Sequence, residues 1–267
     1  MSNRLEAAFR RAAKEKRAAF IAYITAGDPS PARTLDVLRA LERGGADIVE
    51  LGVPFSDPIA DGPINCAAAE RALAAGTTLT GVLQTVRELR FSSSLPIVLF
   101  SYANPILAYG LSRFAVDAAT AGVDGVLLTD VPAEEAGPYY QALRRVGVEL
   151  IPMLAPTSTR ARVKQAKKLA ESFVYFVSHT GVTGPQAQLP VELEDQVRLV
   201  RKLTGRRVAV GFGVAKPEQV NRVAKVADGV VVGSAIVNRI AEIGDRPELF
   251  GEIQRFLQPL RAATRRS

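Results

Sequence analysis

Short apolar runs alternate with amphipathic stretches along nearly the whole chain of 267 residues. The runs are rich in Val, Ile and Leu and are continuous, which is typical of parallel strands buried on both faces. The pattern predicts strands over Ala19–Ile24, Ile48–Val53, Ile97–Ser101, Gly125–Thr129, Glu149–Leu154, Val174–Ser178, Arg207–Val210 and Gly229–Val232. Apolar positions at helical spacing predict helices between them, over Pro31–Arg43, Pro63–Ala75, Leu79–Phe91, Leu111–Ala121, Glu134–Val146, Ser158–Glu171, Leu193–Leu203 and Pro217–Val226.

Eight strands separated by helices are expected to pair in parallel through right-handed crossovers. An open doubly wound sheet is the alternative to a closed barrel. The glycine fingerprint of nucleotide-binding open sheets is missing after the first strand, which continues into Thr25–Pro29. We therefore predict an α/β fold, one (β/α)8 TIM barrel domain over residues 1–267, with additional helices at the N-terminus (Arg4–Glu15) and C-terminus (Pro247–Leu260).

The composition narrows the chemistry. His179 is the only histidine and Cys66 the only cysteine, so a zinc site of the His/Cys type cannot form and we expect no metal. Acid–base work near neutral pH therefore falls to carboxylates. The net charge of +7 comes from scattered basic residues without an aromatic ribbon, so we expect neither nucleic acid nor a membrane as partner. The N-terminus lacks the apolar segment of a signal peptide, which predicts a cytoplasmic protein.

Glu50 interrupts the otherwise apolar second strand. Active sites of such barrels lie at the C-terminal ends of the strands. Because burying an unpaired carboxylate is costly, we expect Glu50 to point into the barrel mouth. Such surroundings would raise its pKa and let it exchange protons near neutral pH. An ion-paired or loop-facing carboxylate is the alternative.

Two further acids, Asp57 and Asp61, lie in the loop after this strand, which is long for a βα loop. The residues themselves leave Asp61 open between chemistry and capping of the helix that begins at Pro63. Asp57, which precedes Pro58, is open between a functional residue and a turn residue.

Glycines follow the last two strands, at Gly211–Gly213 and at Gly233 before Ser234. They let backbone N–H groups approach an anion, and a helix N-terminus adds its dipole. Because these are the loops that bind phosphate in many barrels, we predict a phosphate site there. The Gly-, Thr- and Pro-containing loop over 178–190 predicts a lid that excludes water. We assign no role to His179 within it.

Six segments resemble the tryptophan synthase alpha chain family, in the same order and over nearly the whole chain. The most specific is Val49–Pro63, and the others are Tyr23–Pro29, Ser101–Leu107, Leu154–Thr157, Thr180–Gly184 and Gly211–Val214. The resemblance implies a carbon–carbon lyase of tryptophan biosynthesis. Its reaction would be retro-aldol cleavage of 1-C-(indol-3-yl)glycerol 3-phosphate to indole and D-glyceraldehyde 3-phosphate.

The resemblance also implies roles for individual residues. Glu50 would be the general acid–base residue, and Asp61 would accept the indole N–H and stabilise positive charge on the ring, which makes capping a minor role. The expected substrate pocket consists of Tyr23, Phe100, Leu127, Thr129, Met153 and Tyr175, the last also orienting a catalytic carboxylate. The expected phosphate ligands are Gly184, Gly213, Gly233 and Ser234. Thr183 would meet Asp61 when the lid closes. The second proton transfer stays open between Glu50 alone and Glu50 with a water.

The family works as an α2β2 complex whose beta subunit holds pyridoxal phosphate and receives indole through a tunnel. The resemblance therefore implies a beta subunit that contacts Asp57, Pro58, Asn104 and Pro105, and no cofactor in this chain. Two segments depart from the family pattern. Asn65–Cys66 stand where an Ile-Gln pair is more usual, and Gln186–Gln188 differ from the usual lid.

Three other functions compete with this hypothesis. Another phosphate-binding barrel of indole biosynthesis would need a lysine near a strand end, and none of the eight predicted strands contains one. A regulatory subunit that only activates a beta partner would not need Glu50 and Asp61. A nucleic-acid-binding barrel would bind duplexes in a salt-sensitive way.

Overall fold

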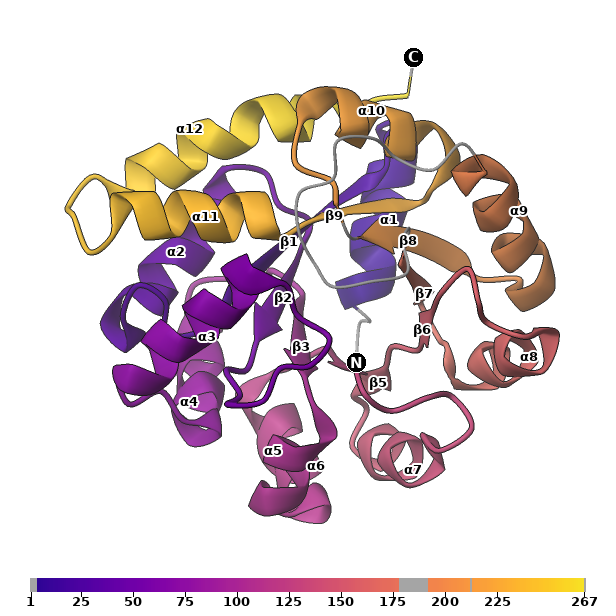
Figure 1. Cartoon of the computed structure of the whole chain (residues 1–267), viewed down its shortest axis with the longest axis horizontal. Coiled ribbons are helices and arrows are strands. Elements are labelled where there is room, and N and C mark those ends of the chain that lie inside the picture. Colours follow the sequence, from indigo (N-terminus) through magenta and orange to yellow (C-terminus); the bar gives the residue numbers. More distant parts are fainter. Residues whose placement is uncertain (1–3, 178–191, 212, 267) are drawn as a thin grey trace.

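A ring of parallel strands forms the centre of the structure, and helices surround it (Figure 1). The computed structural model describes residues 4–177, 192–211 and 213–266. Within these ranges the strands are β1 (Ala19–Thr25), β2 (Ile48–Gly52), β3 (Ile97–Ser101), β4 (Gly125–Leu128), β5 (Glu149–Leu150), β6 (Met153–Leu154), β7 (Phe173–Val177), β8 (Arg207–Gly211) and β9 (Gly229–Val232). They are ordered β5-β4-β3-β2-β1-β9-β8-β7-β6, and each pair is parallel.

The segment from Glu149 to Leu154 closes the barrel. We predicted a single strand here, and the structure instead has two short strands, β5 and β6, because Pro152 has no N–H to donate to a ladder. Ile151 N donates to Val126 O (2.8 Å) on one side, and Pro152 O accepts from Tyr175 N (3.0 Å) on the other. The segment thus joins β4 to β7, and the predicted barrel is confirmed with an interrupted fifth strand.

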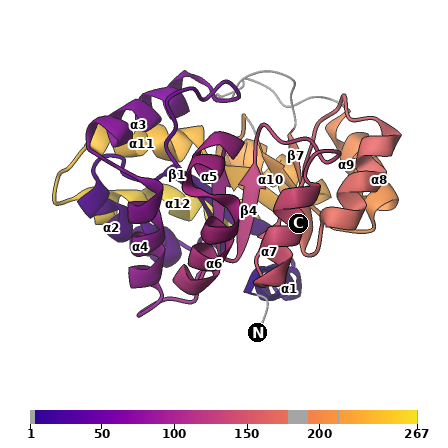
Figure 2. The same ribbon diagram turned by 90° about the horizontal axis from the view of Figure 1, so that it is seen from below.

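The helices of the described ranges are α1 (Arg4–Lys14), α2 (Pro31–Arg43), α3 (Pro63–Ala74), α4 (Leu79–Leu89), α5 (Ala103–Tyr109), α6 (Leu111–Ala121), α7 (Gly137–Arg145), α8 (Arg160–Leu169), α9 (Leu193–Thr204), α10 (Pro217–Val226), α11 (Ser234–Ile243) and α12 (Leu249–Ala262). None of them is long and apolar enough to cross a membrane. Figure 2 shows α1 at the end of the barrel opposite α3. There Leu5 and Phe9 pack beside Gly125 and Gly229, the first residues of β4 and β9.

Three predictions about helices were wrong in detail. We did not predict α5, because its seven residues are too few for a periodic pattern and include Pro105; proline is tolerated in a first turn. The predicted start of α7 at Glu134 was too early, since the helix begins at Gly137. The predicted bounds of α8 were too wide, because Thr159 caps the helix by accepting a hydrogen bond from Arg162 N.

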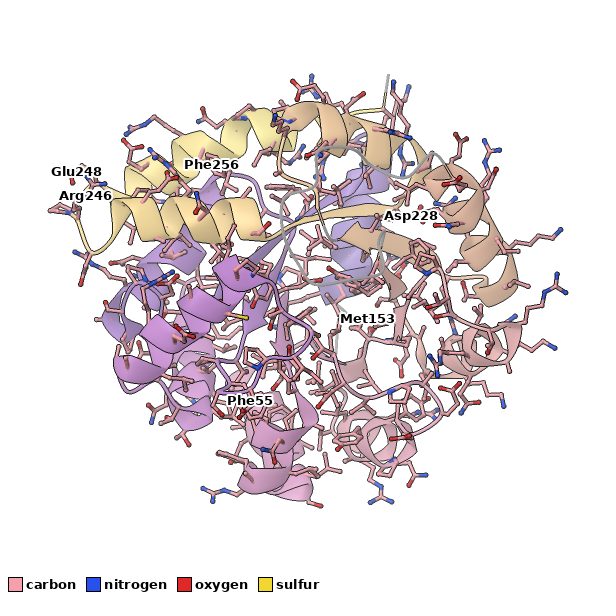
Figure 3. The ribbon with its side chains drawn as sticks, viewed as in Figure 1. Phe55, Met153, Asp228, Arg246, Glu248 and Phe256 are labelled. Carbon is pink, nitrogen blue, oxygen red and sulfur yellow. The ribbon has the colours of Figure 1, made fainter. Side chains whose placement is uncertain are left out.

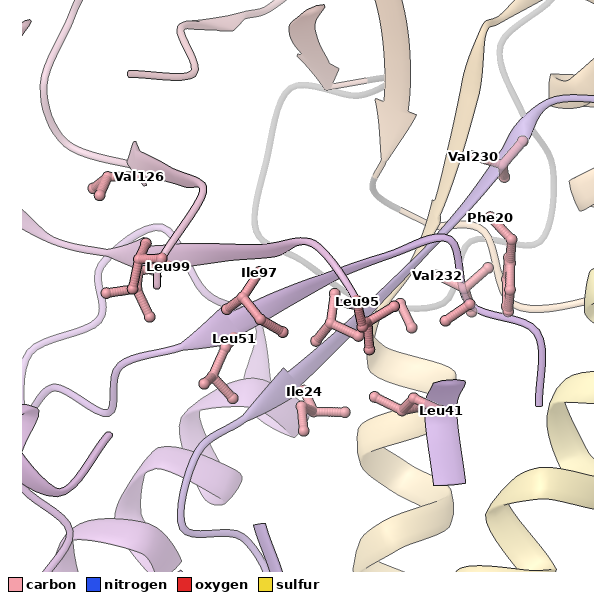
Figure 4. Packing of buried hydrophobic residues seen from close by; sticks show 14 of the residues in the cluster. Phe20, Ile24, Leu41, Leu51, Leu95, Ile97, Leu99, Val126, Val230 and Val232 are labelled. Carbon is pink, nitrogen blue, oxygen red and sulfur yellow. The ribbon is translucent and has the colours of Figure 1, made fainter. Parts of the chain in front are cut away.

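Alternate residues of each strand belong to two different cores. Inside the barrel, Ile21 of β1 and Ile48 of β2 pack with α1. Between strands and helices, Phe20, Ile24, Val49 and Leu51 pack with the helix layer, as Figure 4 shows for several of these residues. Because side chains alternate along a strand, the residue between Val49 and Leu51 must face the barrel interior. That residue is Glu50.

Candidate active site

A cavity opens at the C-terminal ends of the strands, and the polar side chains of Glu50, Asn65 and Ser234 line it. Its empty volume is about 390 Å³, including the opening to solvent. It is lined by Tyr23, Glu50, Asn65, Phe100, Tyr175, Gly213, Val214, Val231, Gly233 and Ser234. Residues from six strands or strand ends and from two helices, α3 and α11, therefore meet in one place.

Glu50 is the buried acid of this cavity. Its side chain is fully buried, and neither carboxylate oxygen has a hydrogen-bond partner among the described residues. Tyr23 of β1 and Val98 of β3 lie beside it in the sheet. Burial raises the pKa of Glu50 from 4.5 to about 8, since a charged carboxylate loses its hydration there. A large fraction of Glu50 is consequently protonated at neutral pH, and it can both donate and accept a proton.

Asp61 lies in the loop between β2 and α3, held by two side chains. Tyr102 Oη donates to Asp61 Oδ2 (3.0 Å), and Asn65 Nδ2 donates to Oδ1 (3.4 Å). Burial raises the pKa of Asp61, and these two hydrogen bonds counteract part of that rise. The N-cap of α3 is Gly62, so the capping alternative for Asp61 is wrong. Its carboxylate is instead oriented by polar neighbours.

Aromatic side chains form the wall next to Glu50. The Tyr23 and Phe100 rings meet edge to face, with centroids 5.1 Å apart. The Tyr175 hydroxyl lies so close to Gly211 that a Cβ at this glycine would be 1.9 Å from it. Burial raises the pKa of Tyr175 well above its ordinary value, and the nearby Glu50 charge adds to the effect. Tyr175 is therefore a neutral hydroxyl close to the carboxyl group of Glu50.

The remaining predicted pocket residues stand apart from the cavity wall. Leu127 is fully buried inside the barrel, and Met153 packs against the same interior core. Met153 lies toward the centre of the ring of helices (Figure 3). Thr129 N donates to Ser101 O (3.0 Å), and the Thr129 hydroxyl donates to the same oxygen (3.4 Å). These three residues do not line the cavity that the described residues form.

Three of the predicted phosphate ligands lie together at the cavity. Gly213, Gly233 and Ser234 line it, and Ser234 is the first residue of α11, with Gly233 as N-cap. The positive end of the α11 dipole therefore faces the cavity. The other phosphate ligand, Gly184, and the lid residue Thr183 lie outside the described residues, as do His179 and Gln186–Gln188.

The predicted partner-contact residues lie at the same end of the barrel as the cavity, in the loop after β2 and in the first turn of α5. Asn104 and Pro105 line a wide groove with Pro54, Phe55 and Ser56. Asp57 and Pro58 follow directly in the same loop. Beside them, two large apolar side chains are exposed, Ile59 at 81% and Leu107 at 55%.

Sequence reasoning missed Tyr102, Asn65 and the exposed pair Ile59 and Leu107. Tyr102 follows β3 and donates a hydrogen bond to Asp61 in the loop after β2. The Asn65 contact was detectable in part, because residues four apart on a helix start share a face. The exposure of Ile59 and Leu107 could not be predicted from the sequence, since apolar residues occur on protein surfaces as well as in cores.

Comparisons with known proteins extend over the whole barrel. The sequence model of the tryptophan synthase alpha chain family matches residues 9–264. The tryptophan synthase alpha chain of Geobacter sulfurreducens is 47% identical over 261 residues, which cover 98% of each chain. That of Solibacter usitatus is 47% identical over 248 residues, which cover 93% of each chain.

The chain belongs to the tryptophan synthase alpha chain family.

Solved structures agree with this membership. Subunit alpha of tryptophan synthase from Legionella pneumophila superposes with a TM-score of 0.91 at 34% identity, covering 99% of each chain. A chain of Mycobacterium tuberculosis tryptophan synthase superposes with a TM-score of 0.90 at 34% identity, covering all of both chains. The predicted family, the TIM barrel and the carbon–carbon lyase activity of tryptophan biosynthesis are thereby confirmed.

Proposed function

We propose that the cavity at Glu50 is where this lyase cleaves 1-C-(indol-3-yl)glycerol 3-phosphate to indole and D-glyceraldehyde 3-phosphate. The observation that carries the proposal is the fully buried carboxyl group of Glu50, which has no hydrogen-bond partner among the described residues and whose pKa of about 8 suits proton exchange at neutral pH. The aromatic rings and the helix N-terminus that line the cavity match an indole group and a phosphate group.

Cleavage requires two proton transfers. A proton must add to indole C3, and the hydroxyl group on the carbon attached to C3 must lose one as it becomes the aldehyde. Protonated Glu50 donates the first proton, and the resulting carboxylate accepts the second, so Glu50 ends in its starting state. The bonding electrons of the broken C–C bond return to the ring.

Positive charge develops on the indole ring once C3 is protonated. Asp61 accepts the indole N–H and stabilises this charge, while Tyr102 and Asn65 hold its two oxygens. Tyr175 orients the Glu50 carboxyl group. Backbone N–H groups at Gly213, Gly233 and Ser234 bind the phosphate, aided by the dipole of α11.

The experiment that tests this proposal measures indole release from indole-glycerol phosphate by the purified chain, alone and with a tryptophan synthase beta subunit. We expect cleavage, faster with the beta subunit. A chain that released no indole even with the partner would be a regulatory subunit, and the proposal would fail.

We further propose that a beta subunit covers Asp57, Pro58, Asn104 and Pro105. The neighbouring Ile59 and Leu107 support this surface, because exposed large apolar side chains beside a wide groove are typical of protein interfaces. Pyridoxal phosphate in the beta subunit and a cytoplasmic location belong to the same proposal.

Replacing Ile59 by Asp is expected to weaken binding of a beta subunit by at least about tenfold, since a charge would be buried in the interface. Isothermal titration calorimetry measures the dissociation constant. Phe91→Asp is the matched control, because Phe91 is 87% exposed and follows α4, away from this surface. Equal affinities of the two variants would contradict the proposed interface.

A further inference from the structure

The side chain of Asn65 connects Asp61 to the cavity. Asn65 is the third residue of α3 and is only 6% exposed. It lines the cavity with Glu50, whereas Asp61 itself is absent from the described lining. Its Nδ2 donates to Asp61 Oδ1. Burying an amide without hydrogen-bond partners is costly, so we expect the Asn65 amide to be held in this wall by its hydrogen bond to Asp61.

The two oxygens of Asp61 accept hydrogen bonds from two different elements. Tyr102, which follows β3, donates to Oδ2, and Asn65 on α3 donates to Oδ1. With one donor on each oxygen, the carboxylate plane cannot rotate freely. The Tyr102 hydroxyl is itself fixed, since it accepts a hydrogen bond from Ala60 N (3.0 Å).

Building on the proposed function, we propose that Asn65 is a positioning residue of the lyase reaction: its amide holds the Asp61 carboxylate ionised and turned toward the indole N–H. An Ile or Leu side chain at this position has no donor and would leave Oδ1 of Asp61 to solvent or substrate alone. The amide thus stabilises the charged form of Asp61 in the cavity wall.

The pH dependence of the reaction distinguishes this role from a structural one. The groups that face Asp61 are Asn65 and Cys66 on α3, Tyr102 after β3, and Tyr23 and Tyr175 inside the barrel. The three tyrosines stay neutral over the working range, because burial raises each pKa. The Cys66 thiol, whose pKa is also raised, stays neutral as well. Asp61 therefore governs the acid limb, and Glu50 governs the alkaline limb.

The test compares Asn65→Leu with Asn65→Gln, measuring indole release as a function of pH with the beta subunit present. In the Leu variant we expect kcat to fall about 5- to 30-fold and the acid limb of kcat/KM to move up by about half to one pH unit, as the loss of one hydrogen bond to a charged group implies. The alkaline limb should stay in place. The Gln variant, which keeps an amide, should recover most of kcat and the wild-type acid limb.

A second arm uses Asp61→Asn as background. There Asn65→Leu is expected to reduce the residual cleavage less than twofold, because the charge that the amide holds is gone. An acid limb that does not move in Asn65→Leu overturns the proposal, whatever the size of kcat, since a folding defect lowers the amount of active enzyme but does not raise the pKa of Asp61. The proposal also fails if Asn65→Leu reduces cleavage as much in the Asp61→Asn background as it does in the wild-type chain. A wild-type chain without cleavage would instead contradict the proposed function.

Discussion

Replacing Glu50 by Gln is expected to lower kcat for indole release by about 10³-fold or more, while binding of a phosphate-bearing indole ligand changes less than about threefold. Gln has nearly the same shape but cannot exchange a proton, and no other carboxyl group lines the described cavity to take over. The proposed phosphate contacts at Gly233 and Ser234 do not involve Glu50. The loss should therefore appear in kcat and not in affinity.

Steady-state indole release and ligand titration together measure this separation. The chain contains no tryptophan, so indole fluorescence reports the bound ligand without a protein tryptophan signal. Glu70→Gln is the matched control, because Glu70 lies on the exposed face of α3 and should keep wild-type turnover. Near-wild-type turnover of the Glu50 variant would remove Glu50 from the mechanism.

The same substitution is expected to make the protein more stable at alkaline pH, by up to about 4–5 kcal/mol above pH 8. Because burial raises the pKa of Glu50 from 4.5 to about 8, the folded chain keeps this proton between those pH values while the unfolded chain releases it. Glu50 therefore makes the free energy of unfolding fall as pH rises through that window. Gln does not titrate, so the variant lacks this fall.

Urea unfolding at several pH values between about 5 and 9 measures the effect. At about pH 5 both proteins have a neutral group at this position and should differ by less than about 1 kcal/mol. The difference should grow in favour of the variant up to about pH 8 and then level off. A difference that stays constant with pH would mean that Glu50 has an ordinary pKa in the folded chain.

Glu50→Gln is thus expected to lower the activity and to raise the stability of the protein, and both effects have the same cause. A buried carboxyl group with no hydrogen-bond partner in the part of the chain that the structure describes is unfavourable for folding, especially when ionised. The same surroundings adjust its pKa to the range in which a proton can be given and taken at neutral pH. An unfavourable burial of this kind is expected at a functional residue, because the property that catalysis needs lowers the stability of the fold.

The order of strands and helices was predictable from the chain itself, because local hydrophobic periodicity reports burial residue by residue. The predicted acid–base role of Glu50 also came from local information, since a carboxylate in a strand covered on both faces has few places to point. The break at Pro152 was also predictable from the sequence, because proline has no N–H to donate and therefore interrupts a central strand.

The surroundings of Asp61 depended on contacts between distant segments. Its two donors come from α3 and from the residue after β3, and only the closed barrel brings Tyr102, 41 residues away, to its carboxylate. From the residues alone, capping and chemistry were equally good explanations, because both need a carboxylate just before a helix. Gly62 as N-cap decided against capping.

The sequence by itself thus determined the barrel, its family and the position of one buried acid, since these follow from periodicity, signature residues and strand alternation. Only the tertiary structure decided which side chains surround the two acids and how each pKa moves. Burial and hydrogen bonding are properties of atoms packed from many segments, and a single stretch of sequence contains only a part of them.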